Sequence, residues 1–96
     1  MNINVSNIKM KKSDFKKSTK SGKKYMIIIN GKTIHFGASG YQQYHDKIGL
    51  YSSLDHGDLN RRKRYRDRHK KIYNKFGVPS YRVKYTPAWF SWYYLW

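Results

Sequence analysis

An Asn-Gly pair between two β-rich runs is the sequence feature that most constrains how this chain can fold. The first run is YMIII at residues 25–29 and the second is KTIHF at residues 32–36, with Asn30 and Gly31 between them. A type I′ turn needs positive φ at both central residues, which asparagine and glycine tolerate best. The pattern therefore predicts a β-hairpin. Because an isolated hairpin is marginally stable in water, one of its faces must pack on other elements.

The second strong feature is a basic run at residues 61–75, which contains nine lysines and arginines and a single aspartate. We expect this run to be helical, because Asp58 is placed to cap its N-terminus. Gly77 and Pro79 are placed to end it. The sequence therefore predicts a helix that carries a dense positive charge over its whole length.

Apolar and aromatic positions in this run follow the spacing of one helical face. They are Tyr65, His69, Ile72 and Phe76. We expect this stripe to face the core and these basic residues to project away from it: Arg62, Lys63, Arg66, Lys70 and Lys71. Neighbouring like charges on a helix repel by a few tenths of a kcal/mol per pair. A helix that tolerates this repulsion is expected to use its positive field.

The C-terminal segment predicts a short aromatic helix. Thr86 followed by Pro87 is typical of a helix start, with an N-cap hydroxyl and proline at the first helical position. One helical face then carries Trp89, Trp92, Tyr93 and Trp96. These aromatic residues form a core, anchor a neighbouring subunit or stack on bases, and the sequence leaves the three interpretations open. From charge alone we expect Arg64 or Arg68 to pair with the terminal carboxylate beside Trp96.

The remaining segments are less regular. Residues 1–23 are rich in lysine and poor in apolar residues, which indicates a flexible Lys-rich arm. We expect residues 41–54 to be irregular and residues 81–85 to form a third short strand or an extended linker. The predicted fold class is α+β: one small domain at residues 24–96, with an N-terminal hairpin packed on the basic helix and on a short C-terminal aromatic helix.

Composition limits the partners and the chemistry. With 21 Lys+Arg against 5 Asp+Glu, the formal net charge is +16, which favours an anionic partner. The chain has no cysteine, and its four histidines lack the spacing of metal ligands, so we expect no metal and no cofactor. None of the five carboxylates lies in an apolar context suited to acid–base catalysis, so we expect no enzyme activity. No apolar run is long enough to cross a bilayer, and we expect no membrane partner.

Three short motifs occur together and in a fixed order: HFG at residues 35–37, R-x-x-R-Y-x-x-R-H at residues 61–69, and an aromatic ending at Trp96. This combination resembles a family of small basic proteins of undetermined function encoded by nucleocytoplasmic large DNA viruses, the giant viruses. The resemblance covers about residues 24–96. Members usually carry arginine where this chain has Trp92, and a tryptophan that they carry after the basic helix is missing here.

The resemblance implies a viral protein, located in the virion and in the host cytoplasm or nucleus during infection. It assigns no catalytic residues. Taken with the charge pattern, it leads us to expect a non-enzymatic, virion-associated basic protein that neutralises the backbone of DNA or RNA. The candidate binding residues are Arg61, Arg62, Lys63, Arg66, Lys70 and Lys71, and the candidate interface or core anchors are Trp89, Trp92 and Trp96.

One alternative stays open from the sequence. A minor capsid or cement protein would also need a basic surface, which would then bind an acidic viral protein surface rather than nucleic acid. In that case the basic arm and the aromatic C-terminal helix would hold the protein between neighbouring subunits of a viral shell.

Overall fold

The hairpin predicted from the Asn-Gly pair is present in the computed structural model, which describes residues 10–96. Strands β2 (Lys23–Ile29) and β3 (Lys32–Ala38) pair antiparallel, and Asn30 and Gly31 at their turn have φ of 49° and 77°. Positive φ at both positions is what a type I′ turn requires. A short strand β1 (Lys16–Lys17) pairs antiparallel with the other edge of β2, so the sheet order is β1-β2-β3.

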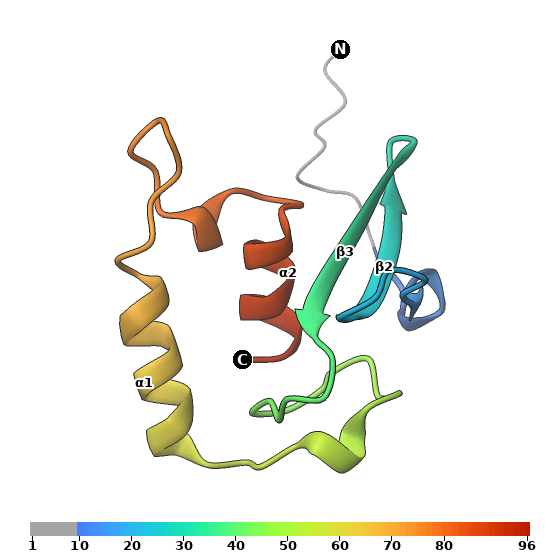
Figure 1. Cartoon of the computed structure of the whole chain (residues 1–96), viewed down its shortest axis with the longest axis horizontal. Helices are drawn as coiled ribbons and strands as arrows, with labels where there is room; N and C mark the ends of the chain where they lie inside the picture. The colour runs from blue at the N-terminus through green and yellow to red at the C-terminus, as the bar shows by residue number, and fades with distance from the viewer. Residues whose placement is uncertain (1–9) are drawn as a thin grey trace.

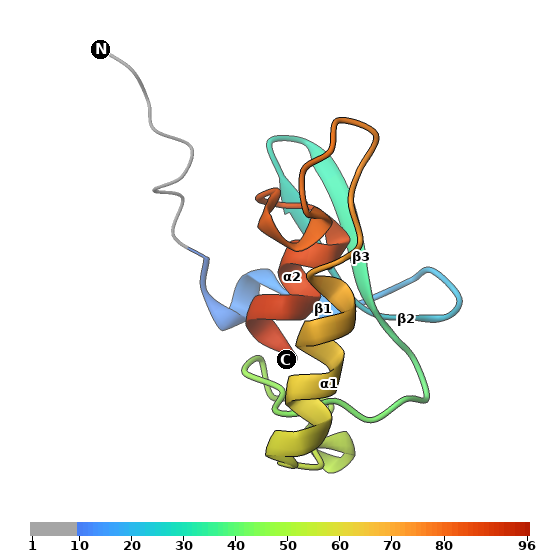
Figure 2. The ribbon, with the colours of Figure 1, turned by 90° about the vertical axis from the view of Figure 1, so that its left-hand side faces the viewer.

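Two helices complete the α+β fold, and the predicted fold class is confirmed. Helix α1 (Leu59–His69) is the basic helix and α2 (Pro87–Tyr94) is the aromatic helix. Figure 1 shows that α2 lies between α1 and the sheet, so the hairpin packs on α2 rather than directly on the basic helix. Figure 2 views the domain from the side of α1, which lies in front of α2 and the sheet. Neither helix of the described part of the chain is long and apolar enough to span a membrane.

The main core lies between the hairpin and one side of α2. Alternation along the strands directs Tyr25 and Ile27 inwards, whereas Ile28 is 68% exposed. Phe36 lies in the middle of the core, stacked on Phe90 of α2 with ring centroids 5.1 Å apart. The buried apolar residues of this cluster are Phe15, Tyr25, Ile27, Ile29, Ile34, Phe36, Ile48, Phe90 and Leu95.

Residues 10–23 belong to the domain, so the prediction of a flexible arm at residues 1–23 is wrong for this part; residues 1–9 lie outside the described residues. Phe15 is only 4% exposed and meets Phe36 and Phe90 edge-on at 5.9 and 6.0 Å. Backbone groups at the free edge of β2 bind β1, and Ser18 Oγ lies 2.7 Å from Nδ1 of His35. The buried ring of Phe15, the packing of Met10 and the pairing of β1 with β2 hold this otherwise hydrophilic segment on the domain.

The basic helix is shorter than the sequence predicts. It ends at His69, and residues 70–79 fold back on themselves, with an antiparallel bridge between Tyr73 and Pro79. As a result Ile72 and Phe76 are 48% and 78% exposed, and the prediction that they face the core is wrong. Residues 81–85 do not form the third strand, because a 3₁₀ turn occupies Ser80–Arg82.

The irregular segment at residues 41–54 is confirmed, with a single 3₁₀ turn at Ser52–Leu54. A buried lysine fixes its start: Lys24 is 2% exposed, and its Nζ donates to the main-chain oxygen of Tyr41 at 2.6 Å and to Oε1 of Gln43 at 2.7 Å. Gln43 in turn donates to Oδ1 of Asp55 at 2.6 Å. Because every buried polar group here has a partner, burial of the ammonium is tolerated.

A buried carboxylate fixes the middle of the same segment. Asp46, 3% exposed, accepts the phenolic proton of Tyr25 and the backbone amide protons of Ile48 and Tyr51 at 2.9 Å each. Burial raises the pKa of the Tyr25 phenol, and the hydrogen bond to Asp46 raises it further. The hairpin and the irregular segment are therefore joined by polar bonds as well as by the apolar core.

We predict that Phe15→Ala lowers the free energy of unfolding by about 3–5 kcal/mol, the usual result of removing a buried phenylalanine. Urea unfolding followed by tryptophan fluorescence measures the change. Phe76→Ala is the matched control, since Phe76 is 78% exposed and its removal is expected to alter stability by no more than about 0.5 kcal/mol. Equal effects of the two substitutions would show that residues 10–23 are not part of the folded unit.

Candidate nucleic-acid interface

Helix α1 starts where the sequence predicts. The Asp58 carboxylate accepts from the backbone amides of Asn60 at 2.9 Å and Arg61 at 3.2 Å, as an N-cap does. The hydrogen bond from the Arg61 amide is the main reason that the pKa of Asp58 lies below its ordinary value. This cap satisfies two of the amides that the first turn of α1 would otherwise leave without a partner.

Aromatic stacking holds α1 against α2. The Tyr65 ring stacks on Trp96 with centroids 4.2 Å apart and planes 4° apart, and His69, one turn later on the same face of α1, stacks on Tyr65 at 3.9 Å. Trp92, 5% exposed, stacks on Tyr81 at 3.9 Å. Trp92 and Trp96 therefore make their stacking contacts within the domain.

Trp89 lies on the side of α2 nearest the main core. It is partly buried and packs against that cluster, with Tyr85 at 5.5 Å and Phe90 at 5.0 Å between ring centroids. All three predicted tryptophan anchors thus make contacts inside the domain, although they do so on different sides of α2.

Two arginines of α1 point into the domain rather than away from it. Arg62 Nε and Arg66 Nη2 both donate to the main-chain oxygen of Trp96, at 2.8 and 3.1 Å. The Arg66 guanidinium also lies 4.7 Å from the Trp92 ring centroid, which is a cation–π distance. The predictions that Arg62 and Arg66 face outwards and that Arg64 or Arg68 binds the end of the chain are therefore wrong.

The physical reason is a rotation of the inward stripe. The residues of α1 that contact α2 and the C-terminus are Arg62, Tyr65, Arg66 and His69, at i, i+3, i+4 and i+7. This is as good a helical face as the apolar one that the sequence suggested. Arginine can occupy it because its guanidinium stacks on aromatic rings while it donates hydrogen bonds.

Most of the remaining basic residues in this region are exposed. Lys63 lies on the outer side of α1, 76% exposed, and donates to Asp67 at 2.7 Å one turn later. The exposed cations along the helix and just beyond it are Lys63, Arg64, Arg68, Lys70 and Lys71. Lys63, Lys70 and Lys71 are therefore available to a partner, as the sequence predicts, whereas the exposed positions of Arg64 and Arg68 were missed.

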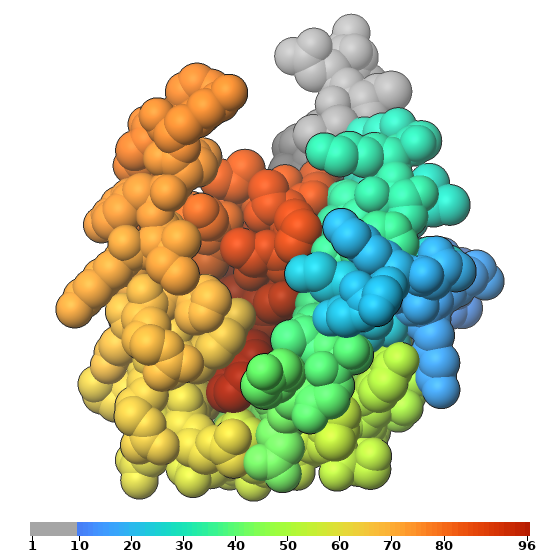
Figure 3. Space-filling view, viewed as in Figure 1, coloured from blue at the N-terminus to red at the C-terminus, as the bar shows by residue number. Residues whose placement is uncertain are grey.

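A groove separates α1 from the end of the hairpin, and its floor is formed by the C-terminal end of α2. Figure 3 shows the hollow between α1 and the green end of β3, with the red floor between them. Its volume is about 410 Å³, within the range of small-ligand pockets. The lining residues are Lys24, Gly37, Ala38, Tyr41, Gln42, Arg61, Tyr65, Arg68, His69, Ser91, Leu95 and Trp96.

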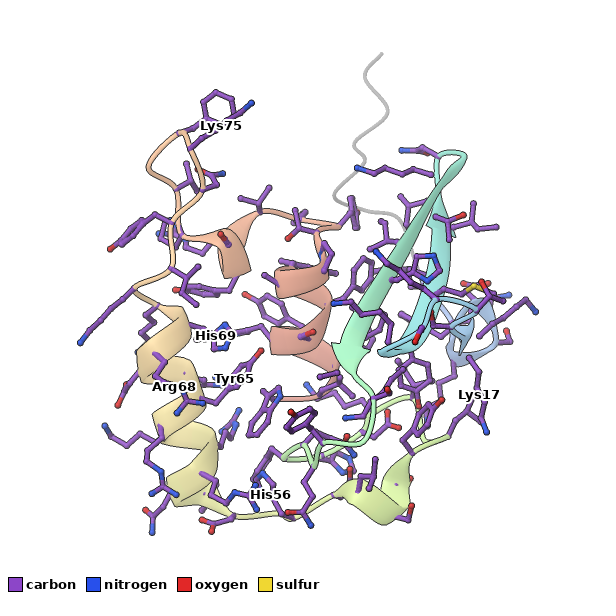
Figure 4. The ribbon with its side chains drawn as sticks, in the orientation of Figure 1. Lys17, His56, Tyr65, Arg68, His69 and Lys75 are labelled. Carbon is purple, nitrogen blue, oxygen red and sulfur yellow. The ribbon has the colours of Figure 1, made fainter. Side chains whose placement is uncertain are left out.

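The groove is cationic and has no aspartate or glutamate in its lining. Figure 4 shows Tyr65 and His69 on the side of α1 that faces α2, and Arg68 lines the same groove. Arg61 reaches across the groove and donates to Oε1 of Gln42 at 2.8 Å. Arg61 thus lies where the sequence placed a binding residue, while Lys24, Tyr41 and Arg68 join it from positions that the helical pattern could not indicate.

Burial sets the protonation of the aromatic groups in the groove. It raises the pKa of Tyr65 to about 12 and, together with the charge of Arg68, lowers the pKa of His69 below its ordinary value. Tyr65 therefore keeps its phenolic proton, and His69 is neutral at pH 7. The positive charge of the groove comes from its arginines and from Lys24, whose pKa is lowered by burial but supported by the nearby charges of Asp46 and Asp55.

The acidic residues compensate little of this charge, because each of them has a structural partner. Asp14 caps a turn through the amide of Lys11, Asp58 caps α1, and Asp46 and Asp55 hold the irregular segment. Asp67 pairs with Lys63. Within residues 10–96 the salt bridges are Lys63–Asp67 and the pair between Asp55 and His45. The outward cations therefore carry an almost uncompensated field.

The comparisons with known proteins give a family. A model described as a family of unknown function (DUF5754) matches residues 13–69, which is more than half of the chain. The chain belongs to this family. No curated protein and no solved structure matches it. The family match begins before Phe15 and ends with α1, so it includes the ordered segment ahead of the hairpin and the basic wall of the groove. Among residues 10–96, no three histidine, aspartate or glutamate side chains are grouped so that they could hold a metal ion.

We predict that Arg66→Gln lowers the free energy of unfolding by about 1–3 kcal/mol, because it removes a charged donor from a partly buried acceptor. Arg64→Gln removes the same charge from an exposed position of the same helix and is expected to change stability by no more than about 0.5 kcal/mol. Urea unfolding of both variants measures the difference. A larger loss in Arg64→Gln than in Arg66→Gln would contradict this orientation of α1.

The pH dependence of stability provides a second test of this side of the domain. Nδ1 of His56 accepts from the amide of Asp58 at 2.9 Å, its Nε2 is buried, and its ring lies 5.2 Å from Trp96. Burial, followed by the charge of Arg61, lowers the pKa of His56 below 6.5. The unfolded chain therefore binds a proton more readily than the folded one, and stability is lost as the pH falls below 6.5.

We expect His56→Asn, which retains an acceptor for the Asp58 amide, to reduce this loss between about pH 7 and 5. Adding His69→Asn should remove most of the remainder, because the pKa of His69 is lowered as well. Urea unfolding over this pH range gives the slopes. If wild type and the double variant lose stability equally, buried neutral histidines are not the cause.

Proposed function

We propose that this protein is a non-enzymatic basic protein that binds nucleic-acid backbone by charge neutralisation. The observation that carries the proposal is the engagement of all five carboxylates in structural contacts, which leaves the outward lysines and arginines other than Lys63 without acidic partners. A positive surface of this kind attracts a polyanion at long range and concentrates it near the protein. The groove then offers the cations of its α1 wall, Arg61 and Arg68, to a bound phosphate.

The binding residues of the proposal are those that the structure leaves accessible. Arg61 and Arg68 would contact phosphates inside the groove, and Lys63, Lys70 and Lys71 would contact phosphates along the outer side of α1. Each neutralised phosphate releases counterions, which is the main source of affinity in such complexes. Contacts of this type carry no sequence information, so we expect binding to DNA or RNA without a preferred sequence.

Association with the virion is part of the proposal and rests on the motifs shared with small basic proteins of giant viruses. The alternative role as a minor capsid or cement protein needs an aromatic anchor for a neighbouring subunit. Trp92 is 5% exposed and Trp96 is stacked between α1 and His56, so these residues offer little surface to such a neighbour. For this reason we favour nucleic acid over an acidic viral protein surface as the partner.

We predict that the double variant Arg68→Gln/Lys71→Gln binds DNA more weakly and with a flatter salt dependence. The logarithm of the binding constant falls with the logarithm of salt concentration by about 0.9 per phosphate contact on duplex DNA. Loss of two contacts should therefore reduce the slope by about 1.8. Fluorescence anisotropy at several salt concentrations measures both quantities.

The matched control is Lys32→Gln/Lys47→Gln, which removes the same charge from exposed positions outside the groove and outside α1. Its slope should stay close to that of the wild type. If both double variants lose affinity equally, net charge alone drives binding, and this interface is wrong. If the wild type binds neither DNA nor RNA at near-physiological salt, the proposed function itself fails.

A further inference from the structure

The loop at residues 70–79, which we call the finger, is a projection none of whose residues belongs to the buried core. Figures 1 and 2 both show it extending in orange beyond the end of α1, and Figure 4 places Lys75 at its tip. Oδ1 of Asn74 accepts from the amides of Phe76 and Val78 at 2.9 and 3.0 Å, and Gly77 supplies a φ of 77°. The tip therefore has a defined shape before any partner arrives.

The finger presents apolar side chains to solvent. Phe76 and Tyr73 are its most exposed members, at 78% and 58%, followed by Ile72 at 48% and Val78 at 40%. Contiguous exposed apolar residues on a small soluble domain mark a contact surface. Since the two aromatic rings are the most exposed, the surface is suited to a partner with flat apolar faces.

The charge around the finger defines that partner further. Residues 68–96 contain no aspartate or glutamate, and Lys70, Lys71 and Lys75 all lie on the finger. The Lys75 ammonium lies 5.2 Å from the Phe76 ring centroid, so cation and aromatic face are presented together. A partner that carries anionic groups and flat apolar faces at short intervals matches both features.

We propose that the finger stacks Phe76 and Tyr73 on unpaired bases of single-stranded nucleic acid, DNA or RNA. This inference rests on the proposed function, because the finger continues from the end of α1, and a backbone held by Arg68 and Lys71 would bring its next bases to the tip. Single strands expose base faces that aromatic side chains bind with little sequence preference. A duplex hides these faces, so a duplex partner would leave Phe76 and Tyr73 in water.

The test compares Phe76→Ser with the wild type on three fluorescein-labelled probes of equal length: a single-stranded oligonucleotide, an abasic strand and a duplex. Loss of one stacked base should weaken binding to the single strand by about tenfold. Affinity for the abasic strand and the duplex should not change, since Phe76→Ser leaves the phosphate-binding cations in place and neither probe offers unstacked base faces. Phe76→Trp should retain binding to the single strand, and Tyr93→Ser, an exposed aromatic of α2, should leave it unchanged.

Two results would overturn the inference while the proposed function stands. One is equal affinity of Phe76→Ser and wild type for the single strand, and the other is an equal loss on the abasic strand. Loss of binding to anionic phospholipid vesicles in Phe76→Ser, with oligonucleotide affinity unchanged, would identify the finger as a membrane contact instead. If the wild type binds none of the three nucleic-acid probes, the proposed function fails, and this inference fails with it.

Discussion

The contact between α1 and the main chain at Trp96 is the interaction on which the cationic surface depends. An isolated helix of 11 residues is marginal in water, and this one also carries repelling charges. None of its residues is fully buried, so no apolar stripe of the usual kind attaches it to the domain. Its attachment comes from the stack of Tyr65 on Trp96 and from the hydrogen bonds of Arg62 and Arg66 to the oxygen of Trp96.

Helix α2 makes this attachment possible because it has apolar residues on all sides. Phe90 packs on the sheet, while Trp92 packs on Tyr81 and under the guanidinium of Arg66. A helix with apolar residues on opposite sides can pack on two neighbours, and α2 buries Phe90 and Trp92 because it lies between the hairpin and α1. The high aromatic content of the C-terminal segment is therefore explained by the packing of one short helix, α2, against both the hairpin and α1.

Sequence patterns predicted the elements whose determinants are local. The Asn30–Gly31 turn, the Asp58 cap and the Thr86–Pro87 start each depend on two or three adjacent residues, and all three occur in the structure. The end of α1 was predicted wrongly, because Gly77 and Pro79 are helix-ending residues that here shape the finger. Its apolar stripe was misplaced, since residues beyond His69 were counted as helical.

The rest could not be predicted because it depends on contacts between distant segments. The position of Phe15 depends on the pairing of β1 with β2 and on the contact with Phe90 of α2. The residues next to Phe15 in the sequence carry no sign of either contact, so this segment reads as a disordered arm. The groove combines Lys24, Tyr41 and Arg68 from three parts of the chain, and no spacing within one element relates them. The inward orientation of Arg62 and Arg66 likewise depends on an acceptor some thirty residues away.

The distribution of charge also couples folding to binding. Carboxylates hold turns, caps and the buried network, while most cations face solvent. The cations are closer together in the folded state than in the unfolded chain, so their mutual repulsion is stronger there. Salt screens this repulsion and stabilises the domain, but it also weakens phosphate binding. A polyanion that binds only the folded state relieves the same repulsion locally and stabilises the fold by mass action. The cationic surface is therefore least costly to maintain when its partner is bound.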